Sequence, residues 1–297
     1  MWSCRRRLHR VVGAGALPAA LALAAAAGAT PAPCPMVGGS SRCELTLGGS
    51  YLRVDGSSQD GGPLLVFDWF VDGVSQLFYE SFVVVDLQDL FGVEMVLESA
   101  TIDPDAGVIA TQLRDETDAL RASALFQLTD LPDGSMVDEV LVVQSRVATV
   151  DGRLYVIHDF DLDDDAVDDT IAASPDGSHI TQADENTTAT ISVLAGPVPD
   201  AFAVAPCCAL DDIVTGSLYF DLGDKAFVPG PDDFQSGMSW DRTLGAGQSF
   251  SVTLRKRITI PEPAGAVATA GALLTLLALL GCRVGRRPRA VPPVPAP

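Results

Sequence analysis

The chain has 297 residues, a formal net charge of −20 and 47% hydrophobic residues. Residues 1–29 and 260–297 hold eight of the 19 Lys and Arg residues but only one of the 39 Asp and Glu residues, so the stretch between them has a net charge of −27. A surface of this sign repels nucleic acid and anionic lipid headgroups, which excludes a nucleic-acid-binding role. It attracts divalent cations and basic partners, or simply keeps the protein soluble.

Residues 1–29 are typical of a secretory signal peptide. Four arginines between residues 5 and 10 form a basic start, residues 11–26 are rich in Ala and Leu, and Ala27-Gly28-Ala29 is a small-residue cleavage site. A retained N-terminal anchor is the alternative, but Ala and Gly drive insertion weakly and Pro18 interrupts the run. We therefore expect a signal helix that the export machinery recognises and that is then cleaved.

Four of the six cysteines lie between the two ends: Cys34, Cys43, Cys207 and Cys208. In an oxidising compartment we expect them to form disulfides, with three possible pairings. Adjacent cysteines can bond each other only in a strained ring, so we favour a pattern in which Cys207 and Cys208 each bond one cysteine of the N-terminal pair. A zinc site and a vicinal redox pair are the alternatives, although adjacent cysteines do not have the ligand spacing of structural zinc sites.

Residues 30–259 have the pattern of one all-β body, an antiparallel β-sandwich. Apolar runs at 66–71 and 74–82 flank Asp72-Gly73, which favours a type I′ hairpin. Runs at 140–150 and 153–162 flank Asp151-Gly152 and predict a second hairpin. Pro132-Asp133-Gly134 is expected to turn strand 122–129 back on itself, so that three central strands form a meander. Further strands are expected at 44–47, 51–54, 93–101, 108–114, 188–194, 201–204, 234–240 and 248–259, with helix confined to the two ends of the chain.

The best candidate for chemistry is the acidic stretch 159–169. If a strand continues into it, Asp159, Asp161 and Asp163 point to one face and the intervening apolar side chains to the other. Together with Asp165, such a row of carboxylates suits calcium, a hard cation that takes six to eight oxygen ligands. The stretch lacks the Gly and Glu of an EF-hand loop, and a solvated acidic loop that protects a sheet edge is the alternative.

No stretch of the sequence carries a specific catalytic motif. A glycosidase needs two carboxyl groups about 5 to 9.5 Å apart, and so many acids are present that any one pair is uninformative. His158 shares a strand face with Phe160 and is expected to be a hydrogen-bonded core residue, whereas His179 is expected in an exposed loop. Nucleophile, phosphate-loop and dinucleotide motifs are absent from the sequence.

The C-terminal end has three parts in a fixed order. Pro261, Glu262 and Pro263 are followed by an uncharged apolar run at 264–282, and then by Arg283, Arg286, Arg287 and Arg289. At about 1.5 Å per residue this run nearly spans the ~30 Å hydrocarbon core of a bilayer, which predicts a transmembrane helix with a cytoplasmic arginine stop. The order of the parts resembles the PEP-CTERM sorting signal of Gram-negative bacteria, over residues 260–290. The chain departs from that pattern in Ile260, where Val is common, and in the Pro-rich tail at 291–297.

This resemblance implies that an exosortase-like enzyme processes the C-terminus. It further implies that the protein is held in the inner membrane before processing and reaches the cell surface or extracellular matrix afterwards. The leading hypothesis is therefore a non-enzymatic protein of the cell surface, associated with exopolysaccharide. A calcium-dependent carbohydrate-binding or adhesive module is the first alternative, and an extracellular glycan-acting enzyme is the second.

Overall fold

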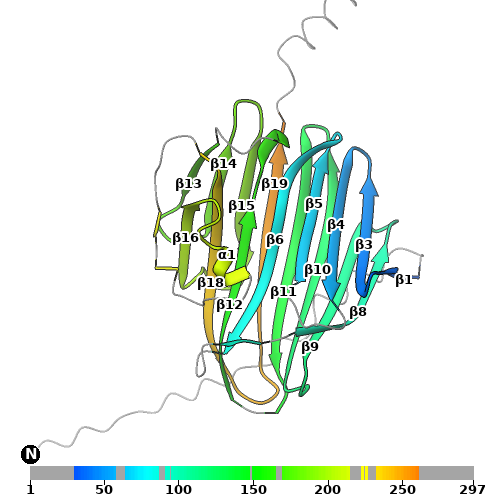
Figure 1. The fold of residues 1–297 in the computed structure, drawn as a ribbon, viewed down its shortest axis with the longest axis vertical. Coiled ribbons are helices and arrows are strands. Elements are labelled where there is room, and N and C mark those ends of the chain that lie inside the picture. The colour runs from blue at the N-terminus through cyan, green and yellow to red at the C-terminus, as the bar shows by residue number, and fades with distance from the viewer. Residues whose placement is uncertain are drawn as a thin grey trace, which may run out of the picture. The chain divides into compact units, whose positions relative to one another are not determined.

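A computed structural model describes residues 30–57, 64–86, 91–93, 95–147, 149–164, 169–214, 222–223, 225–226 and 232–260. These residues form two β-sheets that pack face to face, which confirms the predicted all-β, antiparallel class (Figure 1). Within the described ranges, every strand pairing is antiparallel except the short pairing of β16 with β17.

Sheet A contains, in spatial order, β1 (Ala32–Pro33), β8 (Met95–Asp103), β9 (Val108–Asp115), β10 (Leu120–Leu131), β11 (Gly134–Ser145), β19 (Ser249–Thr259), β15 (Thr188–Ala195), β14 (His179–Ala183) and β13 (Thr170–Ala173). Sheet B contains β17 (Lys225–Ala226), β16 (Ala201–Pro206), β18 (Phe234–Leu244), β12 (Val150–Asp159), β6 (Val74–Asp86), β5 (Leu64–Val71), β4 (Ser50–Ser57), β3 (Ser40–Leu47) and β2 (Met36–Val37), with β7 (Phe91–Gly92) paired to β6. Two single helical turns, η2 (Leu162–Asp164) and α1 (Asp211–Val214), complete the described elements.

Two of the predicted turns are confirmed. β5 and β6 are joined through Asp72 and Gly73, whose positive φ angles of 52° and 82° are those that a type I′ turn requires. β10 and β11 form the predicted hairpin around Pro132-Asp133, and β9 pairs with the other edge of β10. The predicted three-strand meander is wrong in its third member, because the strand that follows β11 lies in sheet B. Gly134 has a φ of 143°, and a Cβ there would lie 2.0 Å from the carbonyl oxygen of Ile258, so only glycine fits.

The second predicted hairpin is wrong. β11 ends in sheet A and β12 begins in sheet B, so the chain crosses from one sheet to the other over residues 146–149. Asp151 and Gly152 lie inside β12, opposite Thr243 and Arg242 of β18. Neither residue has a positive φ, so the Asp-Gly pair continues a strand instead of turning.

The interior between the sheets follows from alternation along the strands. Every second residue of β10 from Leu120 to Leu128 is buried, and so is every second residue of β19 from Phe250 to Ile258. On sheet B, the facing residues include Trp69, Met238 and other large apolar side chains. The strand predicted at residues 248–259 is therefore confirmed, and one of its faces is buried.

Part of sheet B is covered on its other, outer face as well. The segment 207–214, which includes α1, lies over β12, β18 and β16 (Figure 1). Its Leu210 and Ile213, with Leu222, pack onto outward-facing residues such as Tyr155 and Ile157, and all of these side chains are buried. This second, smaller core positions the candidate site described below.

The cysteines pair within their own halves of the chain, which corrects the expected cross-linking. Cys34 bonds Cys43, and Cys207 bonds Cys208. The β2–β3 hairpin folds Cys34 back to a Cα separation of 5.1 Å from Cys43. Cys43 lies on β3 and Cys207 follows β16, six strands away in sheet B. At about 4.8 Å per strand the two are separated by roughly 29 Å, so no bond between them can form.

Several expectations concern residues outside the described ranges. These are the signal peptide at 1–29, the motif Pro261-Glu262-Pro263, the apolar run 264–282, the four arginines after it, the tail 291–297, and Asp165. Among the described residues, no helix has the length and apolar character needed to cross a bilayer. The predicted confinement of helix to the ends needs one correction, because α1 lies within the sandwich sequence.

Candidate functional site

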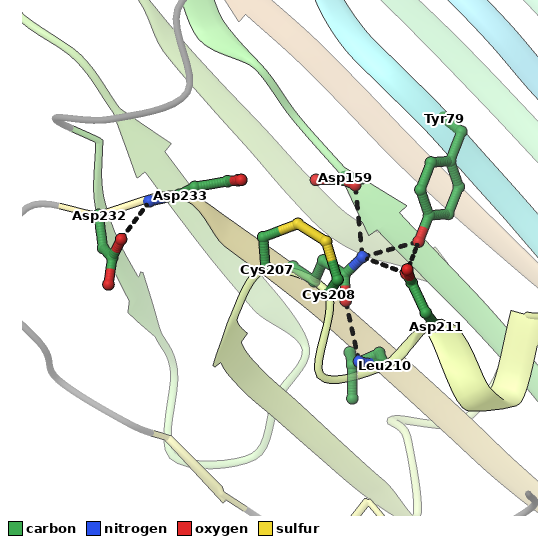
Figure 2. The surroundings of a disulfide bond; sticks show 9 residues. Tyr79, Asp159, Cys207, Cys208, Leu210, Asp211, Asp232 and Asp233 are labelled. Carbon is green, nitrogen blue, oxygen red and sulfur yellow. Dashed lines mark hydrogen bonds between the residues drawn. A yellow bond between two sulfur atoms is a disulfide. The ribbon is translucent and has the colours of Figure 1, made fainter.

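A row of polar side chains crosses three neighbouring strands on the outer face of sheet B. In the strand register Asp159 of β12 lies opposite Tyr79 of β6 on one side and Gln235 of β18 on the other. The preceding residue of β12, His158, points the opposite way, into the space between the sheets, so alternation places this row outside. The segment that follows β16 brings Asp211 and the Cys207–Cys208 disulfide to the row (Figure 2).

Gln235 connects the members of the row. Its Oε1 accepts a hydrogen bond from the backbone N–H of Leu210 at 2.9 Å, which fixes the orientation of the amide. Its Nε2 lies 2.7 Å from the Tyr79 hydroxyl, 2.7 Å from Asp211 Oδ1 and 3.3 Å from Asp159 Oδ2. An amide nitrogen has two hydrogens for these three acceptors. Because the contact with Asp159 is the longest, the Asp159 carboxylate has the weakest hydrogen bond.

The Asp159 side chain is buried, and its carboxylate is poorly stabilised as an anion. Its side chain is 3% exposed, and its Oδ1 accepts no hydrogen bond from the described residues. Burial first, and the charges of Asp161, Asp233 and Asp211 second, raise the pKa of Asp159 to about 7 against the lowering effect of the Gln235 hydrogen bond. Such a carboxyl group binds a proton, or a cation in its place, near neutral pH.

The surrounding acids show the same effect. Burial raises the pKa of Asp161 to about 6, with further contributions from Asp233 and Asp164. The pKa of Asp233 is also raised, by burial first and by its neighbour Asp232 second. The Tyr79 hydroxyl donates to Asp211 at 2.7 Å, and burial and this hydrogen bond raise the pKa of Tyr79, so the phenol stays protonated. The site is anionic and holds its charges close together.

Asp159, Asp233 and Cys207 each offer an atom that lies within 4.8 Å of the other two. Figure 2 shows the carboxyl groups of Asp159 and Asp233 pointing toward each other beside the disulfide. Because Cys207 is bonded to Cys208, its sulfur is not a thiolate and does not serve as a zinc ligand. The ligand atoms that remain are carboxylate oxygens.

The predicted calcium ligands are only partly brought together. β12 ends at Asp159, and the chain then turns, so the assumed continuous strand is wrong. Asp163 has a φ of 59°, and its Oδ1 accepts hydrogen bonds from Gln76 and Thr187 at 3.2 and 2.7 Å. Asp163 therefore belongs to a different set of contacts, whereas Asp161 remains within electrostatic reach of Asp159.

Sequence reasoning missed Asp233 and Gln235. Gln235 lies at the start of β18 and Asp233 directly precedes that strand, more than 70 residues after Asp159. The pairing of β12 with β18 brings this part of the chain to Asp159. The adjacent acids Asp232 and Asp233 before an apolar strand are the signal that the sequence offers, but without the register it does not indicate a partner.

A second group of ionisable residues lies between the two sheets. The buried charge cluster consists of Glu80 and His158 from sheet B and Glu139 and Lys256 from sheet A, none of them more than 1% exposed. Lys256 Nζ donates to Glu80 and, at 2.9 Å, to Glu139. His158 Nε2 lies 3.8 Å from Glu80 Oε1 and stacks on Phe160. The prediction that His158 is a core residue is confirmed, but its ring nitrogens form no hydrogen bonds with the described residues.

Protonation in this cluster follows from burial. Burial and the nearby Glu139 charge raise the pKa of Glu80 well above its usual value, although Lys256 opposes the shift. Burial lowers the pKa of Lys256, but the two glutamates outweigh it and leave that pKa raised. Burial and the Lys256 charge lower the pKa of His158. The cluster therefore holds a protonated lysine, a neutral histidine and a Glu80 carboxyl group that takes up a proton more readily than an exposed glutamate does.

No known protein-family profile matches the chain, and no curated protein sequence matches it. Its fold is similar to that of a bacterial glucoamylase in complex with acarbose, with 8% identity and a TM-score of 0.50 over 83% of this chain. The chain spans 37% of the length of that glucoamylase. A putative aldose 1-epimerase from Escherichia coli K12 is also similar, with 11% identity, a TM-score of 0.50, and coverage of 75% of this chain and 100% of the epimerase. At these identities the likeness concerns the fold.

Proposed function

We propose that the chain is an exported, non-enzymatic protein of the cell surface, associated with exopolysaccharide and delivered through a C-terminal sorting signal. The observation that carries this proposal is the pairing of all four cysteines of the body, Cys34 with Cys43 and Cys207 with Cys208. Disulfides persist in oxidising compartments outside the cytoplasm. Both bonds lie between the apolar N-terminal segment and the Pro-Glu-Pro motif, in the part of the chain that export would deliver.

The charge distribution supports the same proposal. The basic residues of the two ends belong on the cytoplasmic side of a membrane, which leaves the acidic body on the other side. In this proposal the export machinery removes residues 1–29, and the run 264–282 holds the protein in the inner membrane. An exosortase-like enzyme then acts at Pro261-Glu262-Pro263, and the body moves to the cell surface or matrix.

Cell fractionation followed by mass spectrometry tests this proposal. We expect the mature protein to lack residues 1–29 and the region after the motif, and to contain both disulfides. Replacing Pro261, Glu262 and Pro263 by alanine should keep the chain full-length at its C-terminus and in the inner membrane. Replacing Pro292 and Pro293 by alanine is the matched control and should leave processing unchanged. A reduced, full-length chain in the cytosol would refute the proposal.

A calcium-dependent carbohydrate-binding module is a second candidate. The buried Asp159 carboxyl group beside Tyr79 favours it, because a sugar site combines hydrogen-bonding acids with an aromatic side chain. Glycan binding that requires calcium and is lost in Asp159→Asn would support this candidate. Turnover of a glycan that Asp159→Asn abolishes would instead assign a glycan-acting enzyme; a glucoamylase is among the proteins of similar fold.

A further inference from the structure

Two buried carboxylate oxygens on the outer face of sheet B lack a hydrogen-bond donor. Asp159 Oδ1 belongs to a side chain that is 97% buried, and Asp233 Oδ1 is a buried atom of a half-buried side chain. Neither atom accepts a hydrogen bond from the described residues. An unpartnered buried carboxylate is costly, so two that face each other require a proton or a cation between them.

The distance between these groups fits a shared ion. A calcium–oxygen bond is about 2.3 to 2.6 Å long, so two oxygens on opposite sides of one calcium ion lie up to about 5 Å apart. The ligand atoms of Asp159 and Asp233 lie within 4.8 Å of each other. No Lys or Arg side chain that the structure describes forms an ion pair with Asp159, Asp161 or Asp233. The side chains that the structure describes therefore supply no counter-charge to these three acids.

We infer that Asp159 and Asp233 bind a calcium ion on the outer face of sheet B, next to the Cys207–Cys208 disulfide, with Asp161 adding negative charge nearby. The oxidised sulfurs are poor ligands, and carboxylate oxygens select a hard cation over zinc or copper. Calcium tolerates the irregular geometry of a site formed by two strands and a loop, and water completes its coordination. This ligand set differs from a row along residues 159–165, because it joins β12 to the residue that precedes β18.

Binding is a property of the purified protein and does not depend on where the protein resides. The inference rests on the proposed export only for its physiological setting, a compartment with abundant calcium. Failure of the fractionation experiment above would leave calcium binding intact, and failure of calcium binding would leave processing intact.

Calorimetric titration of the detergent-purified full-length chain with calcium chloride tests the inference. We expect one site with a Kd of about 10⁻⁴ to 10⁻³ M, the range of extracellular calcium modules, and a higher melting temperature in calcium. Asp159→Asn and Asp233→Asn should each weaken binding at least tenfold. Asp105→Asn is the matched control, since it removes one exposed charge from the β8–β9 turn of the other sheet.

Three results would overturn the inference. The first is that the native chain shows neither heat of binding nor a higher melting temperature in about 10 mM calcium. The second is that Asp105→Asn weakens calcium binding as much as the two site variants do. The third is that Asp159→Asn and Asp233→Asn both bind calcium as tightly as the native chain. Because Asp159→Asn removes a repelled buried charge, we expect it to fold, which far-ultraviolet circular dichroism checks. Asp233, which is less buried, supplies an independent variant if Asp159→Asn fails to fold.

Discussion

Lys256→Met should strongly destabilise the sandwich, because Lys256 provides the positive charge of the buried charge cluster. Its ammonium group donates to Glu80 and Glu139, one from each sheet, and is itself 1% exposed. Methionine fills a similar volume and keeps the apolar stem, so the substitution tests the charge more than the packing. It leaves two carboxyl groups facing each other without a donor.

The expected cost follows from the burial of the pair. Removing one partner of a buried ion pair costs about 3–5 kcal/mol, since the remaining charge stays desolvated. For a body of this size, each kcal/mol lowers the melting temperature by about 2–4 °C, so we expect a decrease of roughly 6–20 °C. The cost should shrink as the pH falls from 7 to 4, because burial raises the pKa of Glu80 and its carboxylate then takes up a proton.

Urea unfolding followed by the fluorescence of the buried Trp69 and Trp240 measures the effect. Arg255→Met is the matched control, because Arg255 is the neighbouring cation of β19 and pairs with Asp138 at 2.7 Å on the surface. Its loss should cost less than about 1 kcal/mol. The reasoning is refuted if the two variants lose equal stability at pH 7, or if the Lys256→Met deficit is the same at pH 4.

Three further predictions concern the site, a turn and a disulfide. The folded-state pKa of Asp159, raised to about 7, means that the native chain without calcium loses stability as the pH rises from about 4 to 7. Asp159→Asn should lack this loss and be more stable at pH 8 by up to about 4 kcal/mol, whereas parallel pH profiles in urea unfolding would contradict the assignment. Gly134→Ala should lower the free energy of unfolding by at least about 2 kcal/mol, because the added Cβ would lie 2.0 Å from the carbonyl oxygen of Ile258. An unchanged urea midpoint would contradict this, because it would mean that the turn relaxes around the methyl group. Replacing Cys34 and Cys43 together by serine should lower the free energy of unfolding by about 2–3 kcal/mol, the loop-closure entropy for a sequence separation of 9. Calorimetry under non-reducing conditions measures this loss, and a much smaller loss would contradict the prediction.

Local sequence rules predicted the strands and the tight turns well. Asp72-Gly73 and Pro132-Asp133-Gly134 specify their turns through backbone angles that few other residues adopt. The same reasoning failed at Asp151-Gly152, because an Asp-Gly pair permits a turn but does not require one. Which sheet a strand joins depends on partners far away in the sequence, and periodicity contains no such information.

The site was predictable only in part for the same reason. Asp159 was found from the local density of acids, but Asp233 and Gln235 reach it through the register of β12 with β18. The burial of Lys256, by contrast, is indicated by the local sequence. Lys256 has the same parity as Leu254 and Ile258 in an alternating strand, which places its charge inside the sandwich.

The position of β19 in sheet A constrains the order in which the sandwich can fold. This strand is last along the described sequence, yet it lies in the middle of its sheet, with β11 on one side and β15 on the other. Until residues 249–259 emerge from the ribosome or translocon, both neighbours present unpaired edges that invite aggregation. A nascent chain halted before Ser249 should therefore need a chaperone to hold it, and folding of the sandwich should finish only once residues 249–259 are available to pair.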